Sequence, residues 1–329
     1  MIFIKPKYEI IYQKDDILGA YEQSEIGART CYKSENGIKK DENNRSLTAK
    51  DFVSKLMNVN KHGSIAEHGA VYLSIKEYYI QVSPAHWDVK TLSWQIKKYY
   101  ENEYSWVNYK DGVFYITTNL RVINENNWWY DLEDPKITIG KTDNHEERLT
   151  IRFTTQIAIS REANRHRVHS PSEQSTRYCN YAKDKFGNEV NINIPEFVKN
   201  EDKLKQYDNT RNKESWLKNY CHTICNDYDN INNQFSVVDY WLFGNLAAEF
   251  AYQGMIKLGA KPEQARTVLP LDTNTELVHT AYVYDWIQFI KLRCAPNAHP
   301  DIRVLAAQMK EEFILSGWAT EEDFENKED

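Results

Sequence analysis

The sequence lacks any long uninterrupted apolar run. A helix that crosses a membrane needs about 18 or more consecutive apolar residues, and no stretch of the 329 residues meets this requirement. Residues 1–6 also lack the basic and apolar regions of a secretory signal. We therefore expect a protein that has no transmembrane segment and does not act at a membrane.

Cysteine is scarce as well. The five cysteines are scattered along the chain and odd in number, which argues against a disulfide framework. We expect reduced thiols and a cytoplasmic location. Cys221, His222 and Cys225 fall on one predicted helix at a spacing that can seat a metal. A zinc site needs about four ligands, and no second pair lies nearby, so no metal site is predicted.

Positive charge is in deficit. The chain has 41 Lys and Arg residues against 48 Asp and Glu residues, a net charge of −7. This balance argues against general affinity for nucleic acid and is compatible with a local basic pocket for a small anionic ligand. The chain shows no internal repeat and no low-complexity linker. With 41% hydrophobic and 27% charged residues, we expect one globular domain over residues 1–329.

Hydrophobic periodicity predicts a mixture of strands and helices. Ser46 or Thr48 is expected to cap a helix that ends near His62. An acidic, frayed tail is expected over residues 320–329. The other expected strands are 1–12, 113–117 and 275–282, and the other expected helices are 15–30, 214–234, 237–258, 285–293 and 302–315.

The most unusual stretch is 165–178. Its fourteen residues carry three arginines, two histidines, one glutamate and four serine or threonine hydroxyls, with hardly any aliphatic side chain. It follows residues 151–164, which are predicted to form a strand and then a helix. Guanidinium groups, hydroxyls and free backbone N–H groups all donate hydrogen bonds to phosphate oxygens. The pattern therefore favours an anion site, and the alternative is a solvated basic loop.

The order of these residues resembles the signature of the flavin-dependent thymidylate synthases, the ThyX family. That signature has Arg-His-Arg, seven further residues, a serine and then Arg-Tyr, as in residues 165–178. The chain departs from the family pattern where Thr176 replaces a common glycine, Glu162 and His299 replace glutamines, and Gln288 replaces an asparagine. Further segments that resemble the family follow the family order: 28–32, 62–68, 265–271, 292–293 and 298–303.

Residues 77–143 interrupt the resemblance. Compact family members join the flanking segments with far fewer residues, so we interpret this stretch as an insertion in a longer-form member. It carries five of the nine tryptophans of the chain, and this aromatic content predicts that it packs against the body of the protein. The tryptophans are Trp87, Trp94, Trp106, Trp128 and Trp129.

The resemblance implies an α+β, ThyX-type fold in which long helices flank a central mixed or antiparallel sheet. It also implies the reductive methylation of dUMP to dTMP. Methylenetetrahydrofolate would donate the carbon, and NADPH would supply reducing equivalents through FAD. Family members are homotetramers whose pockets use residues of several subunits, and we expect the same assembly here.

The resemblance also implies roles for individual residues. Arg293 would be the catalytic group, because a fixed guanidinium stabilises the anionic form of uracil. His62 would contact flavin or folate, with a capping turn as the alternative. The expected dUMP ligands are Glu162, Arg165, Glu173, Gln174, Ser175, Thr176, Arg177 and Arg266. The expected FAD ligands are Ser64, Arg165, His166, Arg167, Glu173, Tyr282, Tyr284 and Gln288.

Two alternatives stay open at this point. Ser175 resembles a nucleophile beside His166 and His169, but the neighbouring arginines depress imidazole basicity, so we interpret it as a ligand. Arg293 has a structural alternative, a pairing with Asp285 or Asp301. For the whole chain, the alternative to an enzyme is a non-catalytic nucleotide- or phosphate-binding module. Arg266 and Arg293 stand in their own motifs far along the chain, which favours the enzyme.

Overall fold

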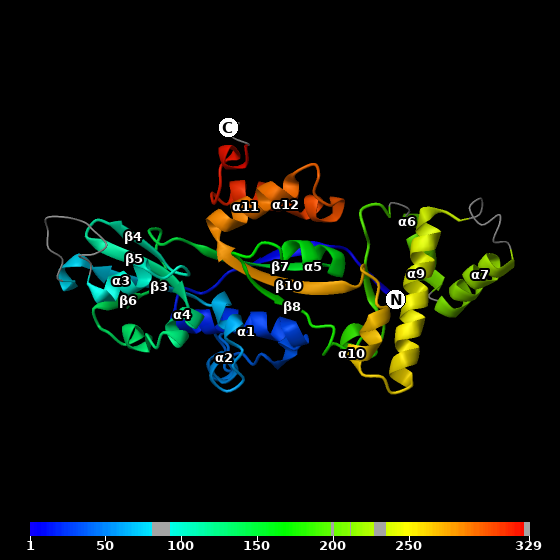
Figure 1. Ribbon diagram of the computed structural model, residues 1–329, viewed down its shortest axis with the longest axis horizontal. Coiled ribbons are helices and arrows are strands. Elements are labelled where there is room, and N and C mark those ends of the chain that lie inside the picture. Colours follow the sequence, from blue (N-terminus) through cyan, green and yellow to red (C-terminus); the bar gives the residue numbers. More distant parts are fainter. Residues whose placement is uncertain (81–92, 199–200, 211, 227–234, 326–329) are drawn as a thin grey trace.

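A computed structural model describes residues 1–80, 93–198, 201–210, 212–226 and 235–325. Trp87 of the predicted insertion therefore lies outside the described residues. The molecule is elongated and has three parts in a row (Figure 1): a sheet at one end, a second sheet in the middle, and a group of helices at the other end. Each part has its own hydrophobic core cluster.

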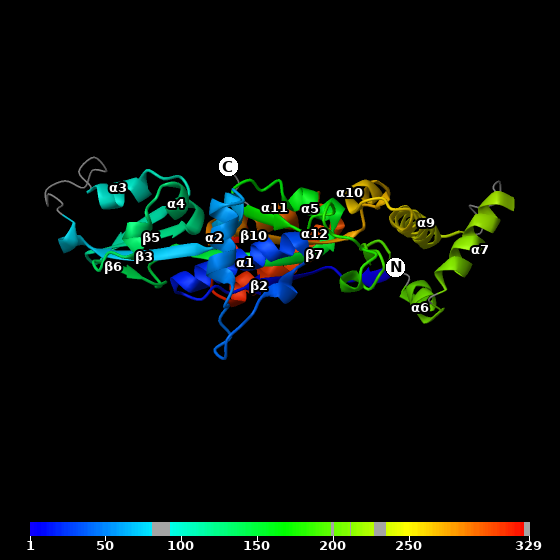
Figure 2. The same cartoon turned by 90° about the horizontal axis from the view of Figure 1, so that it is seen from below.

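The central sheet is antiparallel throughout, with strand order β2-β7-β10-β8. One face packs on α5, α11 and α12 through large apolar side chains such as Phe153, Trp286 and Phe313. Helix α1 lies on the opposite side (Figures 1 and 2). The strands are β2 (Lys7–Ile11), β7 (Arg148–Gln156), β8 (Ser170–Glu173) and β10 (Asn274–Tyr282). The helices are α1 (Ile17–Tyr32), α5 (Ile157–Ala163), α11 (Val283–Cys294) and α12 (Pro300–Leu315).

The predicted insertion contributes three strands to a second antiparallel sheet, in which they join β3, a strand that precedes residue 77. The strand order is β4-β5-β3-β6. Its core is continuous with α1 and α2, since Tyr21 and Met57 belong to the same cluster as Leu73 and Ile116. The insertion packs against the body, as its aromatic content predicts. The elements are α2 (Ala49–Asn58), β3 (Ala70–Lys76), α3 (Trp94–Tyr100), β4 (Trp106–Lys110), β5 (Val113–Asn119), α4 (Leu120–Glu125) and β6 (Ile137–Ile139).

The third part packs helices on a two-stranded parallel ladder. Its longest helix begins at Ser236, where a capping box with Asp239 satisfies the first N–H groups. The elements are β1 (Ile2–Ile4), β9 (Asn191–Asn193), α6 (Glu201–Thr210), α7 (Lys213–Asn226), α9 (Val237–Lys257) and α10 (Pro262–Ala265). The part of the helix predicted over 214–234 that follows Asn226 lies outside the described residues.

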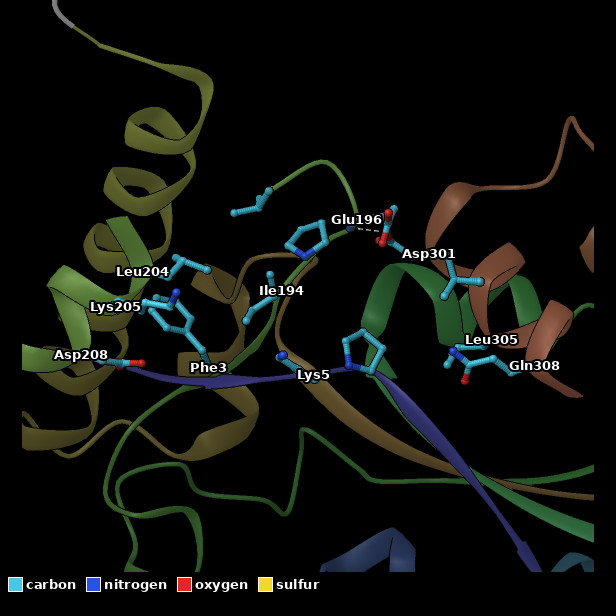
Figure 3. Close-up of a pocket in the computed structure, with 14 residues that line it drawn as sticks. Phe3, Lys5, Ile194, Glu196, Leu204, Lys205, Asp208, Asp301, Leu305 and Gln308 are labelled. Atoms are coloured by element: carbon cyan, nitrogen blue, oxygen red, sulfur yellow. Dashed lines mark hydrogen bonds between the residues drawn. The ribbon is translucent and has the colours of Figure 1, made fainter. Parts of the chain in front are cut away.

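A cavity of about 700 Å³ separates this third part from α12 (Figure 3). Phe3, Leu204 and Leu305 line it, and the backbone N–H of Glu196 donates to the Asp301 carboxylate at 2.7 Å on its rim. Its lining, as far as the chain is described, includes none of the residues predicted for the functional site.

The mixed α+β class agrees with the prediction, and local details differ from it. Ser46, and not Thr48, caps α2, because its Oγ accepts from the Ala49 N–H at 3.0 Å. The helix ends at Asn58, several residues before His62. The expected frayed tail begins as a one-turn helix, η9 (Glu321–Phe324), because Thr320 and Asp323 form a capping box. No helix in the described part of the chain is long and apolar enough to span a membrane.

Candidate functional site

Residues 165–178, the signature stretch, follow helix α5 and include the edge strand β8 of the central sheet. As predicted, residues 151–164 form a strand and then a helix, β7 and α5. A loop follows, and the chain then pairs with β10 as the edge strand β8, with Glu173 opposite Leu277. Because successive strand residues point to opposite faces, Glu173 faces α5 while Ser172 faces α1.

A first cavity of about 660 Å³ gathers residues from three distant parts of the chain; we call it the Ser175 cavity. Arg266, in the 3-10 helix η8 (Arg266–Val268), donates from Nη1 to Thr176 Oγ1 at 3.2 Å. The fold thus joins two motifs that lie 90 residues apart. Six predicted dUMP ligands line this cavity: Glu173, Gln174, Ser175, Thr176, Arg177 and Arg266. Cys31, Tyr32 and Arg161 also line it and were not predicted.

Ser175 is held in place by two hydrogen bonds to backbone groups. Its Oγ accepts from the Arg177 N–H at 3.3 Å, and its own N–H donates to the Cys31 carbonyl at 2.9 Å. The two histidines considered as its base are engaged elsewhere: His166 with Arg293, and His169 with His279. Neither histidine is therefore placed to act as a base for Ser175, and its role as a ligand stays a prediction.

Glu173 is held by three donors. Its Oε1 accepts from Ser160 Oγ at 2.7 Å and from Thr275 Oγ1 at 3.2 Å, and its Oε2 accepts from Asn164 Nδ2 at 3.1 Å. A carboxylate with this many partners is fixed in orientation. It lines the Ser175 cavity as a preorganised acceptor.

Arg293 lies near the end of α11 and is tied to the end of α5. Its Nε donates to His166 Nε2 at 3.0 Å, and its Nη2 donates to the Glu162 carbonyl at 2.6 Å. Its Nη1 also pairs with the Glu162 carboxylate at 3.2 Å. In the structure the Arg293 guanidinium pairs with Glu162, and the Asp301 carboxylate instead accepts from Gln156 and from the Glu196 backbone.

His166 is therefore a neutral acceptor. Burial, with a further contribution from Arg293, lowers the pKa of His166 to about 4. Burial also lowers the pKa of the Arg293 guanidinium from its ordinary value. The Arg293 guanidinium is therefore a partly buried cation, and the neighbouring His166 imidazole carries no second positive charge.

A second cavity of about 880 Å³ lies on the other side of the signature loop; we call it the Arg167 cavity. Three predicted FAD ligands line it, Arg167, Tyr282 and Tyr284. About half of its wall comes from the insertion, which the sequence did not assign to any site. The insertion residues include Tyr104, Ser105, Trp106, Asn119, Arg121 and Glu125.

Tyr282 connects the insertion to the central sheet. Its hydroxyl donates to the carbonyls of Tyr104 and Thr117 at 3.4 and 3.3 Å, and its ring lies 5.9 Å from that of Trp106. The Arg148 guanidinium lies 5.5 Å from the Tyr282 ring. Burial raises the pKa of Tyr282 to about 12, so the hydroxyl stays a donor.

The remaining predicted residues line neither cavity. Arg165, Ser64 and Gln288 are exposed. His62 precedes the 3-10 helix η2 (Gly63–His68) without capping it through its side chain. Among the described residues, no group of three or more His, Cys, Asp or Glu side chains is arranged to hold a metal.

Comparisons with known proteins bear on this arrangement. Residues 145–315, slightly more than half of the chain, match the model of the Thy1 family, described as thymidylate synthase complementing protein. The flavin-dependent thymidylate synthases of two strains of Thermus thermophilus are each 36% identical over 76 residues. That alignment covers 22% of this chain and only 28% of each relative.

Similar solved structures include a UMP/dUMP methylase, PolB, from Streptomyces cacaoi bound with 5-Br dUMP. It shows 17% identity and a TM-score of 0.38 over 96% of this chain and 93% of that one. ThyX from Helicobacter pylori with FAD and dUMP shows 11% identity and a TM-score of 0.38 over 98% and 100%. The family match contains the signature stretch, Arg266 and Arg293. The chain therefore belongs to the Thy1 family of thymidylate synthase complementing proteins.

Proposed function

We propose that this protein is a flavin-dependent thymidylate synthase, which converts dUMP to dTMP by reductive methylation. The observation that carries the proposal is the Ser175 cavity, where Arg266 meets Thr176 beside Ser175 and Arg177. Family membership and the activity of the Thermus relatives support it. Methylenetetrahydrofolate serves as the carbon donor and NADPH as the reductant.

The Ser175 cavity suits a nucleoside monophosphate. Arg266, Arg177 and Arg161 bring three guanidinium groups to it, and Ser175 and Thr176 add hydroxyls. Guanidinium forks and hydroxyls are the donors that phosphate prefers. Glu173 and Gln174 add an acceptor and an amide for the hydroxyl and N–H groups of a sugar or base. One cavity thus offers both kinds of partner that dUMP requires.

The Arg167 cavity suits the flavin. Its volume of about 880 Å³ fits a large cofactor, and it combines arginines with the adjacent Trp106 and Tyr282 rings. Arginines bind the two phosphates of FAD, and aromatic rings pack on its planar groups. When bound, FAD accepts reducing equivalents from NADPH and supplies the hydride that reduces the transferred one-carbon unit. Arg167, Tyr282 and Tyr284 are the residues of this chain that would hold it.

Arg293 is the proposed group that stabilises negative charge on uracil. Its half-buried guanidinium is fixed by Glu162 and His166, and a preorganised cation in a dry site stabilises developing charge strongly. The neutral His166 accepts from it and does not compete with it. Both Nη atoms bond Glu162, and Arg293 lines neither cavity in the described structure, so the uracil carbonyls would take the place of these bonds when dUMP binds.

The proposal includes a homotetramer with shared pockets and a cytoplasmic location. Arg165, Ser64 and Gln288 are exposed and line neither cavity, which supports a role for them in the pocket of a neighbouring subunit. The five cysteines are free thiols, as expected for a reducing compartment.

Three measurements on the purified protein test the proposal. The protein should bind FAD and show flavin absorbance. NADPH oxidation should depend on dUMP and methylenetetrahydrofolate, and chromatography should detect dTMP. Binding of dUMP without flavin and without NADPH oxidation would instead support the non-catalytic binding module.

A further inference from the structure

Two buried histidines lie between the two cavities. His279, in β10, is fully buried and lines neither cavity, while His169 ends the signature loop and lines the Arg167 cavity. Their Nδ1 atoms are 3.2 Å apart. On the far side, His279 Nε2 lies 3.1 Å from Asn164 Oδ1, and Asn164 Nδ2 donates to Glu173 Oε2 at 3.1 Å. An unbroken chain of hydrogen bonds therefore joins the Arg167 cavity to the Glu173 carboxylate.

The direction of this chain follows from its last acceptor. A carboxylate only accepts, so the Asn164 amino group faces Glu173 and its carbonyl oxygen faces His279. His279 must then carry its proton on Nε2, which leaves a lone pair on Nδ1. His169 must carry its proton on Nδ1 to donate to that lone pair. With both rings neutral, this is the one tautomer assignment that makes every bond in the chain.

Both rings stay neutral in this environment. Burial lowers the pKa of His169 to about 3 and lowers the pKa of His279 well below its ordinary value, and neighbouring histidines add to both shifts. The charged and titratable groups facing the pair are His166 on the loop, His68 across the sheet, and Arg148 on β7. In this assignment the remaining ring atom, His169 Nε2, carries a lone pair, so its 3.5 Å approach to the Asp285 carbonyl is not a hydrogen bond.

Aromatic packing fixes the ring planes. The His169 ring lies 4.4 Å from Trp286 and 5.6 Å from Phe289, and His279 lies 6.3 Å from Phe153 at an angle of 84°. A close-packed surround of this kind prevents free rotation of the rings. His68 is equally buried on the opposite face of β10, where it bonds Thr280 and Ser172 and does not join the chain.

We propose that His169, His279 and Asn164 form a one-directional hydrogen-bond chain that positions the Glu173 carboxylate for the nucleotide in the Ser175 cavity. The inference rests on the proposed function, in which Glu173 contacts dUMP. His169 and His279 are positioning residues, because they act through Asn164 and Glu173. Asn164 fixes one carboxylate oxygen while Ser160 and Thr275 fix the other.

Two substitutions of His279 distinguish a role in the hydrogen-bond chain from a role in packing alone. His279→Leu removes both hydrogen bonds. His279→Gln keeps a donor and an acceptor, and its amide can bond Asn164 and His169 in the same order. We expect His279→Leu to raise the Kd and KM for dUMP by about tenfold, the effect of one charge-assisted contact, with FAD occupancy and kcat nearly unchanged. His279→Gln should recover most of the affinity.

His68→Leu is the matched control, since it removes two hydrogen bonds at equal burial without touching the chain. It should lower the thermal midpoint and leave the Kd for dUMP, measured by calorimetry on flavin-loaded protein, within about twofold of wild type. Wild-type dUMP affinity in His279→Leu, or an equal loss in His68→Leu, would overturn the proposal.

A measurement on the unsubstituted protein tests the chain directly. Nitrogen-15 spectra of histidine-labelled protein should show His279 protonated at Nε2 and His169 at Nδ1 at neutral pH. A proton on His279 Nδ1 would overturn the chain even if the Leu variant failed to fold. If the wild-type protein binds no dUMP in calorimetry, the proposed function fails, and the tautomers still decide whether the chain exists.

Discussion

The Ser175 cavity and the Arg167 cavity lie on either side of one loop, yet they are built in different ways. The Ser175 cavity is made by the signature stretch, α5, the end of α1 and the Arg266 segment. The Arg167 cavity takes about half of its wall from the insertion, through residues such as Trp106 and Arg121. The proposed nucleotide site is therefore made of family motifs, and the proposed cofactor site beside it takes about half of its wall from the insertion. Five experiments separate the two.

Acidification should destabilise the fold around both cavities, because buried histidines lie between them. The pKa of His68 and of His169 is lowered to about 3, mainly by burial, while an unfolded histidine titrates near 6.5. Between these values the unfolded chain binds more protons, so their stabilisation is complete above pH 6.5 and is lost as the pH falls. Urea unfolding should show a loss of about 2 kcal/mol per buried histidine between pH 6.5 and 5.

Two variants check the origin of that slope. His68→Gln should flatten the dependence of the unfolding free energy on pH. His222→Gln, which changes an exposed residue of α7, should leave it unchanged. Equal slopes in His68→Gln and wild type would show that the buried imidazoles do not set the acid stability.

Arg293 should give the largest effect on turnover. Arg293→Ala removes the fixed guanidinium, and we expect kcat to fall by about 100-fold or more with FAD still bound. Arg293→Lys keeps the charge and loses the planar fork, so it should rescue little. Arg303→Ala is the control, since this partly buried α12 arginine donates to the Pro296 carbonyl at 2.9 Å and lines neither cavity. Unchanged turnover per flavin-loaded molecule would end the catalytic assignment.

Arg167→Ala should act on the cofactor. The loss of one charge-assisted contact to a phosphate costs roughly 1.5–3 kcal/mol, so FAD affinity should fall by about tenfold to 100-fold. Equilibrium dialysis with absorbance at the flavin band measures it. Wild-type stoichiometry of FAD after gel filtration would remove Arg167 from the flavin site.

Arg266→Ala should act on the nucleotide instead. We expect a rise of about tenfold in the Kd for dUMP, measured by calorimetry, with FAD occupancy unchanged. Arg167→Ala and Arg266→Ala thus serve as controls for each other. If both variants lost the same ligand, the two cavities would not be separate sites.

Trp106→Ala should have the smallest effect and tests the insertion. The ring adds a packing surface to the Arg167 cavity, and losing such an aromatic contact costs about 1 kcal/mol. FAD affinity should fall about fivefold and dUMP affinity should not change. Trp94→Ala is the control, because Trp94 is an exposed insertion tryptophan that does not line the cavity. An equal loss in both variants would argue for a general effect on the insertion fold.

The elements and cavities differ in how far local sequence determines them. Helices α9, α11 and α12 could be predicted because their apolar spacing persists over several turns. Part of the Ser175 cavity could be predicted because residues 173–178 are consecutive. Trp106 and Tyr104 could not be assigned, since no local pattern says that β4 starts beside the end of β10. The pairing of Arg293 with Glu162 could not be predicted for the same reason. Asp285 is near in sequence, but the end of α5 brings Glu162 closer in space.

The insertion wall of the Arg167 cavity has a consequence for inhibitor selectivity. A compound confined to the Ser175 cavity meets side chains that belong to the family motifs and would bind many relatives alike. A compound that extends into the Arg167 cavity can stack on Trp106 and donate hydrogen bonds to Glu67 and Glu125, whose carboxylates pair with Arg121. From the sequence resemblance we expect compact family members to have far fewer residues in this region. Chemical discrimination between long and compact members is therefore best sought at the insertion wall.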